Sequence, residues 1–395
     1  MAIKSSQTSL TGKKEFFPTV AEIDLNALLH NLKEIRKLTG SDRAIIAVVK
    51  ADAYGHGAVR ISQTLEEAGV TALGVALVQE GIELRQGGIR LPILVMGSIL
   101  KEQIPPLFEY QLTPVLFQEA LIPHLEKEAE AQGITLPVHI KIDTGMGRLG
   151  IQPGQLSSFI KEILRNKRIK IEGVMTHLSS ADHIGSPRLS QQLALWEKTL
   201  EELEAFQLQP SQIHLANSAA IASLRELDSN PIRPGLMLYG YSSIRNPPLS
   251  LEPVLAFKTR VVHLKTVPAG TPISYGGTFV TSRQSVIATL AVGYADGYWR
   301  ALSNCGKVLI HGQRVPVVGR VCMDMTMVDV TDLSRVQIGE EAVLIGKQGK
   351  ESISAEEVAS WIGTISYEVL CGIGKRVPRI YLEGLASPSL ARFAR

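Results

Sequence analysis

Short apolar runs alternate with longer amphipathic segments through the first two thirds of the chain. The apolar runs cover residues 45–49, 72–77, 92–96, 113–117, 138–142, 171–176, 212–215 and 231–239. Between them, apolar residues recur at helical spacing, most clearly in residues 25–38, 118–131 and 187–206. Short buried strands that alternate with helices indicate βαβ units and a parallel sheet. A number of strands near eight favours a closed barrel over an open sheet.

The pattern changes after residue 253, where strand-like runs follow one another between Gly and Pro turns. These runs cover residues 254–266, 285–292, 307–310, 314–318, 325–330 and 341–345. One late helix is indicated, because Ser354 and Glu357 stand at the spacing of a capping box. The sequence therefore predicts an α/β chain, with an N-terminal (β/α)8 TIM-like barrel over residues 1–253 and a mostly β C-terminal domain over residues 254–395.

Composition narrows the class of protein. Of 395 residues, 45% are apolar and 20% are charged, which is typical of a globular protein with a large core. The formal charge of +3 is spread along the chain without a Lys/Arg block, so no nucleic-acid partner is expected. The three cysteines lack the spacing of zinc sites or disulfide frameworks, so no metal is expected. Because no signal segment and no apolar stretch of roughly 18 residues is visible, we expect a cytoplasmic protein without membrane contact.

The first candidate for chemistry is Lys50, which directly follows the apolar run 45–49. A barrel strand opens at its C-terminal end onto the face that carries active sites. On position alone, a solvated strand-end lysine is the commoner interpretation. An amine that is crowded at such an end, however, loses part of its charge stabilisation and becomes able to form a Schiff base.

The residues from Lys50 onwards read KADAYGHG, which resembles the cofactor-lysine segment of the alanine racemase family. Seven further segments match motifs of that family in the same order and in both predicted domains. They are KIDTGMGRLG (141–150), TH (176–177), HLANS (214–218), RPG (233–235), GYADG (293–297), VCMD (321–324) and YEVLC (367–371). The resemblance extends from about residue 44 to residue 381, and it implies a pyridoxal-phosphate-dependent isomerase.

Two catalytic bases are implied by the resemblance. Lys50 would carry pyridoxal 5'-phosphate as a Schiff base and serve one face of the substrate, while Tyr275, in ISYGG (273–277), would serve the other. Such a pair would interconvert L-alanine and D-alanine and supply D-alanine for peptidoglycan. Ionising a phenol of pKa about 10 at neutral pH costs about 4 kcal/mol. Tyr275 therefore needs positive neighbours, for which His177 and Arg148 are the candidates.

Arg233 indicates the type of reaction, because the resemblance places it against the pyridine nitrogen of the cofactor. A guanidinium only donates hydrogen bonds, so the ring nitrogen must accept one and stays unprotonated. An unprotonated ring withdraws electrons less strongly, which favours racemisation over transamination. Without the surrounding motif, a surface ion pair would be an equal interpretation of this arginine.

The resemblance assigns further residues to the cofactor and the substrate. The cofactor-binding set is Lys50, Tyr54, His177, Ser218, Arg233, Gly235, Leu236 and Tyr367, with Ser218, Gly235, Leu236 and the two tyrosines at the phosphate. Arg148 and the Met323 backbone would bind the substrate carboxylate. Lys141 matches a lysine that is carbamylated in many relatives; an unmodified lysine paired with Asp143 is the alternative. In the family the tyrosine base comes from a partner subunit, which implies a homodimer with composite active sites.

Four alternatives share part of this pattern. A broader-specificity amino-acid racemase is the nearest, although such enzymes are commonly exported and no signal segment is visible. A decarboxylase would pair the ring nitrogen with an acid rather than with Arg233. A non-catalytic pyridoxal-phosphate carrier resembles the barrel alone, and a Schiff-base aldolase would not account for Arg233 or Tyr367. The segment MTM (325–327) departs from the family, where a polar Gln is common, and this affects local packing only.

Overall fold

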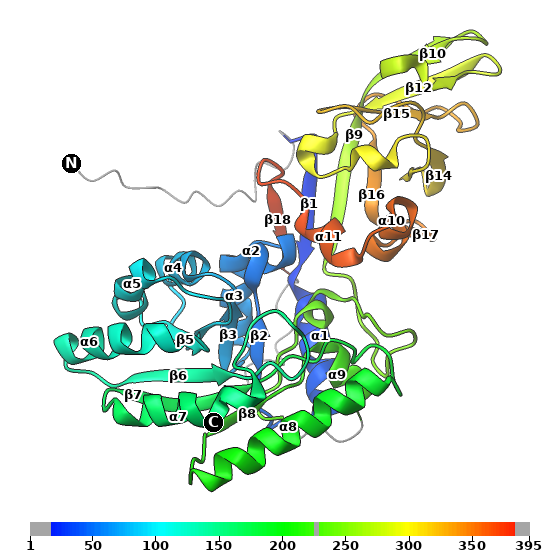
Figure 1. Ribbon diagram of the computed structural model, residues 1–395. Coiled ribbons are helices and arrows are strands. Elements are labelled where there is room, and N and C mark those ends of the chain that lie inside the picture. Colours follow the sequence, from blue (N-terminus) through cyan, green and yellow to red (C-terminus); the bar gives the residue numbers. More distant parts are fainter. Residues whose placement is uncertain (1–16, 225–228, 384–395) are drawn as a thin grey trace, which may run out of the picture. The chain divides into compact units, whose positions relative to one another are not determined.

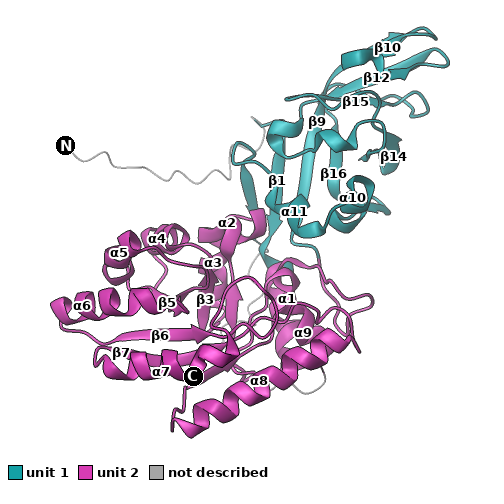
Figure 2. Cartoon of the chain, in the orientation of Figure 1, with its two compact units in different colours: residues 1–27, 253–395 teal, residues 28–252 magenta. Residues whose placement is uncertain are grey.

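The computed structural model describes residues 17–224 and 229–383. The chain divides into two compact units, one formed by residues 28–252 and the other by residues 1–27 together with 253–395 (Figure 2). The first unit contains a parallel sheet with its helices, and the second contains a mostly antiparallel sheet. Each unit is described by itself below.

The first unit is built on seven parallel strands in sequential order, each paired with the next (Figure 1). They are β2 (Ile46–Val48), β3 (Ala72–Val75), β4 (Ile93–Val95), β5 (Thr113–Leu116), β6 (Leu136–Lys141), β7 (Ile169–Met175) and β8 (Gln212–His214). Each coincides with one of the first seven predicted apolar runs. Parallel strands with a helix after nearly every strand are buried on both faces, which is why they read as continuous apolar runs.

Residues 231–234 occupy the eighth position and connect the two edges of this sheet. On one side Ile232 pairs with Ile45, and the Ile46 N–H donates to the Ile232 carbonyl at 2.9 Å. On the other side Arg233 pairs with Asn217, and the Arg233 N–H donates to the Ala216 carbonyl at 2.9 Å. The sheet is thereby closed, and the predicted (β/α)8 barrel class is confirmed.

The barrel interior is filled by side chains from its strands. One buried cluster combines residues of β2, β3, β4, β5 and β7, with two half-buried side chains packed against it. Its members are Ile46, Ala72, Leu94, Val115 and Met175, with Met96 and Phe117 beside them. Each large aliphatic side chain buried in this way contributes roughly 1.5–3 kcal/mol to folding.

Helices surround the barrel strands (Figure 1). The α-helices are α1 (Leu25–Thr39), α2 (Lys50–Gly55), α3 (Ala58–Glu67), α4 (Val78–Gln86), α5 (Ile104–Glu109), α6 (Ile122–Gln132), α7 (Leu156–Arg165), α8 (Pro187–Ala205) and α9 (Ser218–Ser223). Short 3-10 helices are η3 (Lys101–Gln103), η4 (Glu119–Leu121), η5 (Pro153–Gln155) and η6 (Leu236–Tyr239). The three segments with helical spacing correspond to α1, α6 and α8. Residues 236–239, predicted as the end of a strand, instead form η6, because the chain turns at Gly235.

The second unit is organised around the long strand β9 (Leu255–Val267), which pairs with β1, β12 and β16. Its other strands are β1 (Val20–Asp24), β10 (Pro272–Ile273), β11 (Phe279–Val280), β12 (Ser285–Leu290), β13 (Lys307–Ile310), β14 (Gln313–Pro316), β15 (Thr326–Asp329), β16 (Glu341–Gln348), β17 (Glu351–Ile353) and β18 (Arg379–Leu382). Its helices are η7 (Tyr275–Gly277), η8 (Tyr294–Asp296), η9 (Arg300–Leu302), α10 (Ala355–Ile362) and α11 (Ser366–Cys371). The predicted cap of α10 is present, since the Ser354 hydroxyl accepts from the Glu357 N–H at 3.1 Å.

The prediction that the whole of residues 1–253 belongs to the barrel differs from the structure at its N-terminal end. Strand β1 pairs in parallel with β18 and antiparallel with β9, so it belongs to the sheet of the second unit. Both partners lie more than 200 residues away along the chain, and periodicity within a short segment carries no information about such pairing. No helix in the described part of the chain is long and apolar enough to cross a membrane.

Asn31 is a fully buried amide that ties α1 to the end of the first unit. Its Nδ2 donates to the carbonyls of Leu238 and Glu252 at 3.1 and 2.7 Å, and its Oδ1 accepts from the Glu252 N–H at 2.7 Å. We expect Asn31→Ala to lower the free energy of unfolding by about 2–4 kcal/mol, because buried backbone groups lose their partners. Urea denaturation checks this against Asn26→Ala, an exposed site on the same helix. Equal midpoints for the two variants would contradict the expectation.

Candidate active site

Lys50 lies two residues after the end of β2 and precedes a left-handed helical turn. Residues Ala51, Asp52, Ala53 and Tyr54 all have φ between 53° and 54° and ψ between 39° and 51°. This conformation costs an L-amino acid roughly 1–2 kcal/mol per residue, and none of the four is glycine. Strain of this kind persists only where surrounding contacts enforce it, and it is concentrated at functional sites.

Two carboxylates hold the turn by accepting backbone N–H groups. Glu80 Oε1 accepts from the Ala51 N–H at 2.6 Å, while its Oε2 accepts from the Ala76 and Leu77 N–H groups at 2.7 and 3.0 Å. Asp52 Oδ1 accepts from the Ala58 N–H at 2.7 Å. Hydrogen bonds to charged groups are each worth roughly 1.5–3 kcal/mol, so together they offset much of the conformational cost.

Tyr239 packs beneath the same turn. Its side chain is fully buried, and its hydroxyl donates to the Val48 carbonyl at the end of β2 at 2.9 Å. The Tyr239 ring lies 4.8 Å from the Tyr54 ring and 4.6 Å from the His56 ring, centroid to centroid. The backbone on both sides of Lys50 is therefore fixed.

Arg233 is buried at the C-terminal ends of β7 and β8, with only 3% of its surface exposed. Its Nη1 donates to Nδ1 and the carbonyl of His214 at 2.8 and 2.7 Å. Its Nη2 donates to the carbonyls of Thr176 and Leu215 at 2.7 and 3.3 Å. Four of its five N–H groups are thus engaged, and its Nε–H has no acceptor among the described residues. Burial lowers the pKa of Arg233 to about 9, so the side chain remains a cation at neutral pH.

The cations of this site lower the pKa values of their neighbours. Burial, followed by the charges of Arg148 and Arg233, lowers the pKa of Lys141 to about 8. Burial, followed by the charges of Arg233 and Lys141, lowers the pKa of His177 to about 3. His177 is therefore neutral at neutral pH when Lys141 and Lys50 are charged, so Arg148 is the better candidate for a positive neighbour. Lys50 contributes to both shifts, so these five side chains share one electrostatic environment.

Ser218, Gly235 and Tyr54 meet at one place near the first turn of α9. The Ser218 hydroxyl accepts from the N–H groups of Gly235 and Met237 at 2.9 and 3.4 Å. A side chain at Gly235 would lie 2.5 Å from the Tyr54 hydroxyl oxygen, so only glycine permits this approach. Leu236 follows as the first, buried residue of η6. These hydroxyl and backbone groups are the kinds that bind phosphate oxygens.

Arg148 lies on the loop that follows β6 and is exposed. The loop is shaped by Asp143, whose carboxylate accepts from the Gly145 and Gly147 N–H groups at 3.0 Å. The guanidinium is therefore presented at the C-terminal end of the barrel, the same end as Lys50.

The remaining predicted site residues lie in the second unit. Tyr275 is the first residue of η7 and is 73% exposed, Met323 is 52% exposed, and Tyr367 lies in α11. The residue before Tyr275, Ser274, has φ 64° and ψ −173°, a region that is almost restricted to glycine and costs roughly 1–3 kcal/mol. Its hydroxyl donates to the Arg320 carbonyl at 2.7 Å and holds the turn. The structure thus divides the predicted site into a barrel group and a second-unit group.

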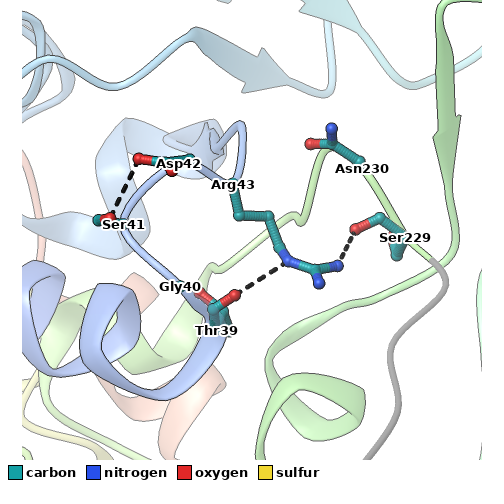
Figure 3. A pocket seen from close by; sticks show the side chains of 7 residues that line it. All are labelled: Thr39, Gly40, Ser41, Asp42, Arg43, Ser229 and Asn230. Carbon is teal, nitrogen blue, oxygen red and sulfur yellow. Dashed lines mark hydrogen bonds between the residues drawn. The ribbon is translucent and has the colours of Figure 1, made fainter.

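A separate pocket lies at the opposite end of the barrel strands, before β2 and before residue 231 (Figure 3). It is lined by Thr39, Gly40, Ser41, Asp42, Arg43, Ser229 and Asn230. The Arg43 guanidinium donates to the carbonyls of Thr39 and Ser229 at 3.1 and 2.6 Å. Active sites of such barrels lie at the C-terminal ends of the strands, so this pocket is not the candidate site.

Sequence reasoning assigned no role to several residues that contact the site residues, namely Glu80, His214, Tyr239 and Ser274. His214 stands inside the HLANS motif, so its position could have been noticed in the sequence. Glu80 and Tyr239 lie in ordinary helical contexts, where nothing in the sequence marks them.

Two known protein families match the chain, one over each of its two regions. The family described as "Alanine racemase, N-terminal domain" matches residues 23–243, and "Alanine racemase, C-terminal domain" matches residues 254–381. An alanine racemase of Halothermothrix orenii is 46% identical over 366 residues, which cover 92% of this chain and 97% of the relative.

Solved structures resemble the chain over nearly its whole length. The alanine racemase of Bacillus anthracis with bound L-Ala-P superposes with a TM-score of 0.88 at 38% identity, covering 93% of this chain and 96% of that one. The alanine racemase of Bartonella henselae with covalently bound pyridoxal phosphate has a TM-score of 0.83 at 30% identity, covering 92% and 99%. The two domain matches and this extent of identity show that the chain belongs to the alanine racemase family and is an isomerase.

Proposed function

We propose that this chain is an alanine racemase that interconverts L-alanine and D-alanine with pyridoxal 5'-phosphate. The observation that carries the proposal is the Arg233 guanidinium, which keeps one unengaged N–H, at the same end of the barrel as Lys50. A donor that cannot accept a proton suits a pyridine nitrogen that must remain unprotonated. An acid at this position would instead have favoured a decarboxylase.

The residues present fit the cofactor. Lys50 stands on a rigid turn and supplies the amine for a covalent link. Tyr54, Ser218, Gly235 and Leu236 would hold the phosphate, together with Tyr367 of the second unit. When bound, the cofactor supplies an electron sink for the charge left on the substrate after its α-proton is removed.

Two bases then decide the stereochemical outcome. Lys50 Nζ would hold or release the α-proton on one face of the substrate, and the Tyr275 hydroxyl would do so on the other. One base removes a proton while the other returns one, so the reaction needs no net proton. Because His177 is neutral, it can assist Tyr275 only as a hydrogen-bond partner, and Arg148 remains the candidate cation.

The substrate carboxylate calls for a cation and a backbone donor, roles that we assign to Arg148 and the Met323 N–H. We assign carbamylation to Lys141, because a buried amine with a pKa of about 8 is partly neutral at neutral pH and can add carbon dioxide. The resulting anion would balance Arg148. Tyr275 and Met323 are exposed in the single chain, which suits a homodimer in which each subunit contributes these residues to its partner's active site. We place the enzyme in the cytoplasm, where it would supply D-alanine for peptidoglycan.

The nearest alternative is a racemase of broader specificity, and assays with several L-amino acids distinguish the two. Family membership over residues 254–381 argues against a non-catalytic carrier, which resembles the barrel alone.

We expect the purified protein to be yellow and to racemise L-alanine faster than other L-amino acids in a chiral assay. Lys50→Ala should abolish racemisation and the absorbance of the covalently held cofactor, because no other amine replaces Nζ. Lys101→Ala, an exposed site in the same unit, serves as the control. Retained turnover in Lys50→Ala would remove the central assignment.

Tyr275→Phe should slow α-proton exchange with solvent deuterium from one enantiomer by roughly 100-fold or more, the usual contribution of a positioned base. Exchange from the other enantiomer and cofactor absorbance should change little, because Lys50 is intact. Proton NMR of both enantiomers in deuterium oxide measures this. Equal slowing for both enantiomers, or loss of the cofactor, would make Tyr275 a structural residue instead.

Carbamylation of Lys141 should give a carbamate signal in carbon-13 NMR with labelled bicarbonate. Carbon dioxide adds to the neutral amine, so the signal should grow as the pH rises through about 8, the lowered pKa of Lys141. The signal should disappear in Lys141→Ala and persist in Lys101→Ala. A signal that survives Lys141→Ala would place the modification elsewhere.

A further inference from the structure

The positive charge of Arg233 is buried without a direct counter-ion. Its hydrogen bonds go to three carbonyl groups and one imidazole nitrogen, and no carboxylate of the described residues pairs with it. A buried charge without an ionic partner is costly unless neighbouring dipoles are strongly oriented toward it. Among these four acceptors, only the His214 imidazole can change its orientation or its proton position. The partners of His214 therefore influence how well it stabilises the charge of Arg233.

A chain of side chains leads from that imidazole to a carboxylate. His214 Nε2 lies 2.7 Å from His139 Nδ1, and His139 Nε2 lies 3.6 Å from Glu172 Oε2. Both rings are buried, with 0% and 2% of their surfaces exposed, whereas the Glu172 side chain is 37% exposed. The chain therefore connects the buried guanidinium to an anion near solvent.

The proton on each ring follows by elimination. Arg233 can only donate, so His214 Nδ1 accepts and the single proton of neutral His214 is on Nε2. That proton is donated to His139, so His139 Nδ1 also accepts and its proton is on Nε2, facing Glu172. A doubly protonated His139 would bring two N–H groups together at the 2.7 Å contact. Burial, followed by the charge of Arg233, holds the pKa of His214 well below its usual value, which agrees with a neutral ring.

Strands β6 and β7 contain two features that make room for this series of side chains. Val138 pairs with Ile171 and His139 with Gly173, so Glu172 is the extra residue of a β-bulge between β6 and β7. Bulges re-aim side chains and are frequent beside active sites. A side chain on Gly173 would lie 2.4 Å from His139 Nδ1, so glycine leaves the space that the ring occupies.

We propose that Glu172 and His139 are positioning residues, which act through His214 to orient the Arg233 guanidinium and to supply its counter-charge. The proposal rests on the proposed role of Arg233 at the cofactor's ring nitrogen. In the series Arg233, His214, His139 and Glu172, every N–H points away from Arg233 and toward Glu172. These residues therefore deliver no proton to the cofactor's ring nitrogen. They hold the Arg233 guanidinium in one orientation, and the ionised Glu172 carboxylate stabilises the polarisation of both imidazole rings.

The first test measures proton positions in the unmodified holoenzyme. Nitrogen-15 NMR with labelled histidine, assigned by His214→Gln and His139→Gln, should show a protonated Nε2 and a bare Nδ1 for both rings. A proton on His214 Nδ1, or a doubly protonated His139 at neutral pH, would overturn the proposal. This NMR measurement does not depend on catalytic turnover, so its outcome is independent of whether the proposed function is correct.

The second test removes the charge of Glu172 while keeping its shape. Glu172→Gln should lower kcat for racemisation by roughly 10-fold with little change in KM. Losses of this size are typical when a carboxylate that hydrogen-bonds a metal-binding histidine is removed from an enzyme, and the arrangement here is analogous. It should also shift the His139 and His214 nitrogen signals. Glu162→Gln, which removes another partly exposed carboxylate with an ion-pair partner in the same unit, should change neither.

Unchanged kcat and unchanged histidine signals in Glu172→Gln would overturn the proposal, as would an equal loss in Glu162→Gln. If the wild-type protein racemised no amino acid while the histidine signals shifted as expected, the proposed function would fail and the counter-charge role would stand. Circular dichroism and thermal unfolding of each variant identify any that do not fold, in which case the first test decides.

Discussion

The hydrogen bonds of Arg233 are the interaction on which the rest of the barrel site depends. Parallel strands end in carbonyl groups that need donors, and this one side chain satisfies the carbonyls of Thr176, His214 and Leu215. Its backbone meanwhile closes the barrel beside Asn217. Its charge lowers the pKa values of Lys141, His177 and His214, so barrel closure and the electrostatics of the site have a common origin.

Lys50 is positioned by a different device. Four residues in a left-handed conformation direct the chain out of β2, and Glu80, Asp52 and Tyr239 supply the contacts that make this conformation tolerable. A rigid attachment point suits the role proposed for this lysine, which is to hold a cofactor and to exchange a proton, because a displaced amine would lose its alignment with the substrate. Ser274 repeats the pattern in the second unit, where a strained residue directly precedes Tyr275.

Much of the fold was predictable because it depends on local pattern. The eight barrel positions and helices α1, α6 and α8 were visible as apolar runs and helical spacing, since burial on both faces leaves a continuous signature. Strand β1 was not, because its partners β9 and β18 are remote in sequence. The candidate residues came from motifs, yet the neutral state of His177 was missed, because a sequence does not show which cations surround a ring.

Motifs and periodicity are local properties of the chain, so the family, the order of the elements and the residue types available for chemistry could all be inferred from the sequence. How those residues act depends on their contacts in the folded protein. A bulge brings Glu172 to His139, His139 on β6 meets His214 on β8 across the intervening strand β7, and barrel closure brings His214 to Arg233. Proton positions and pKa values follow from such contacts between distant segments, and they exist only once the chain has folded.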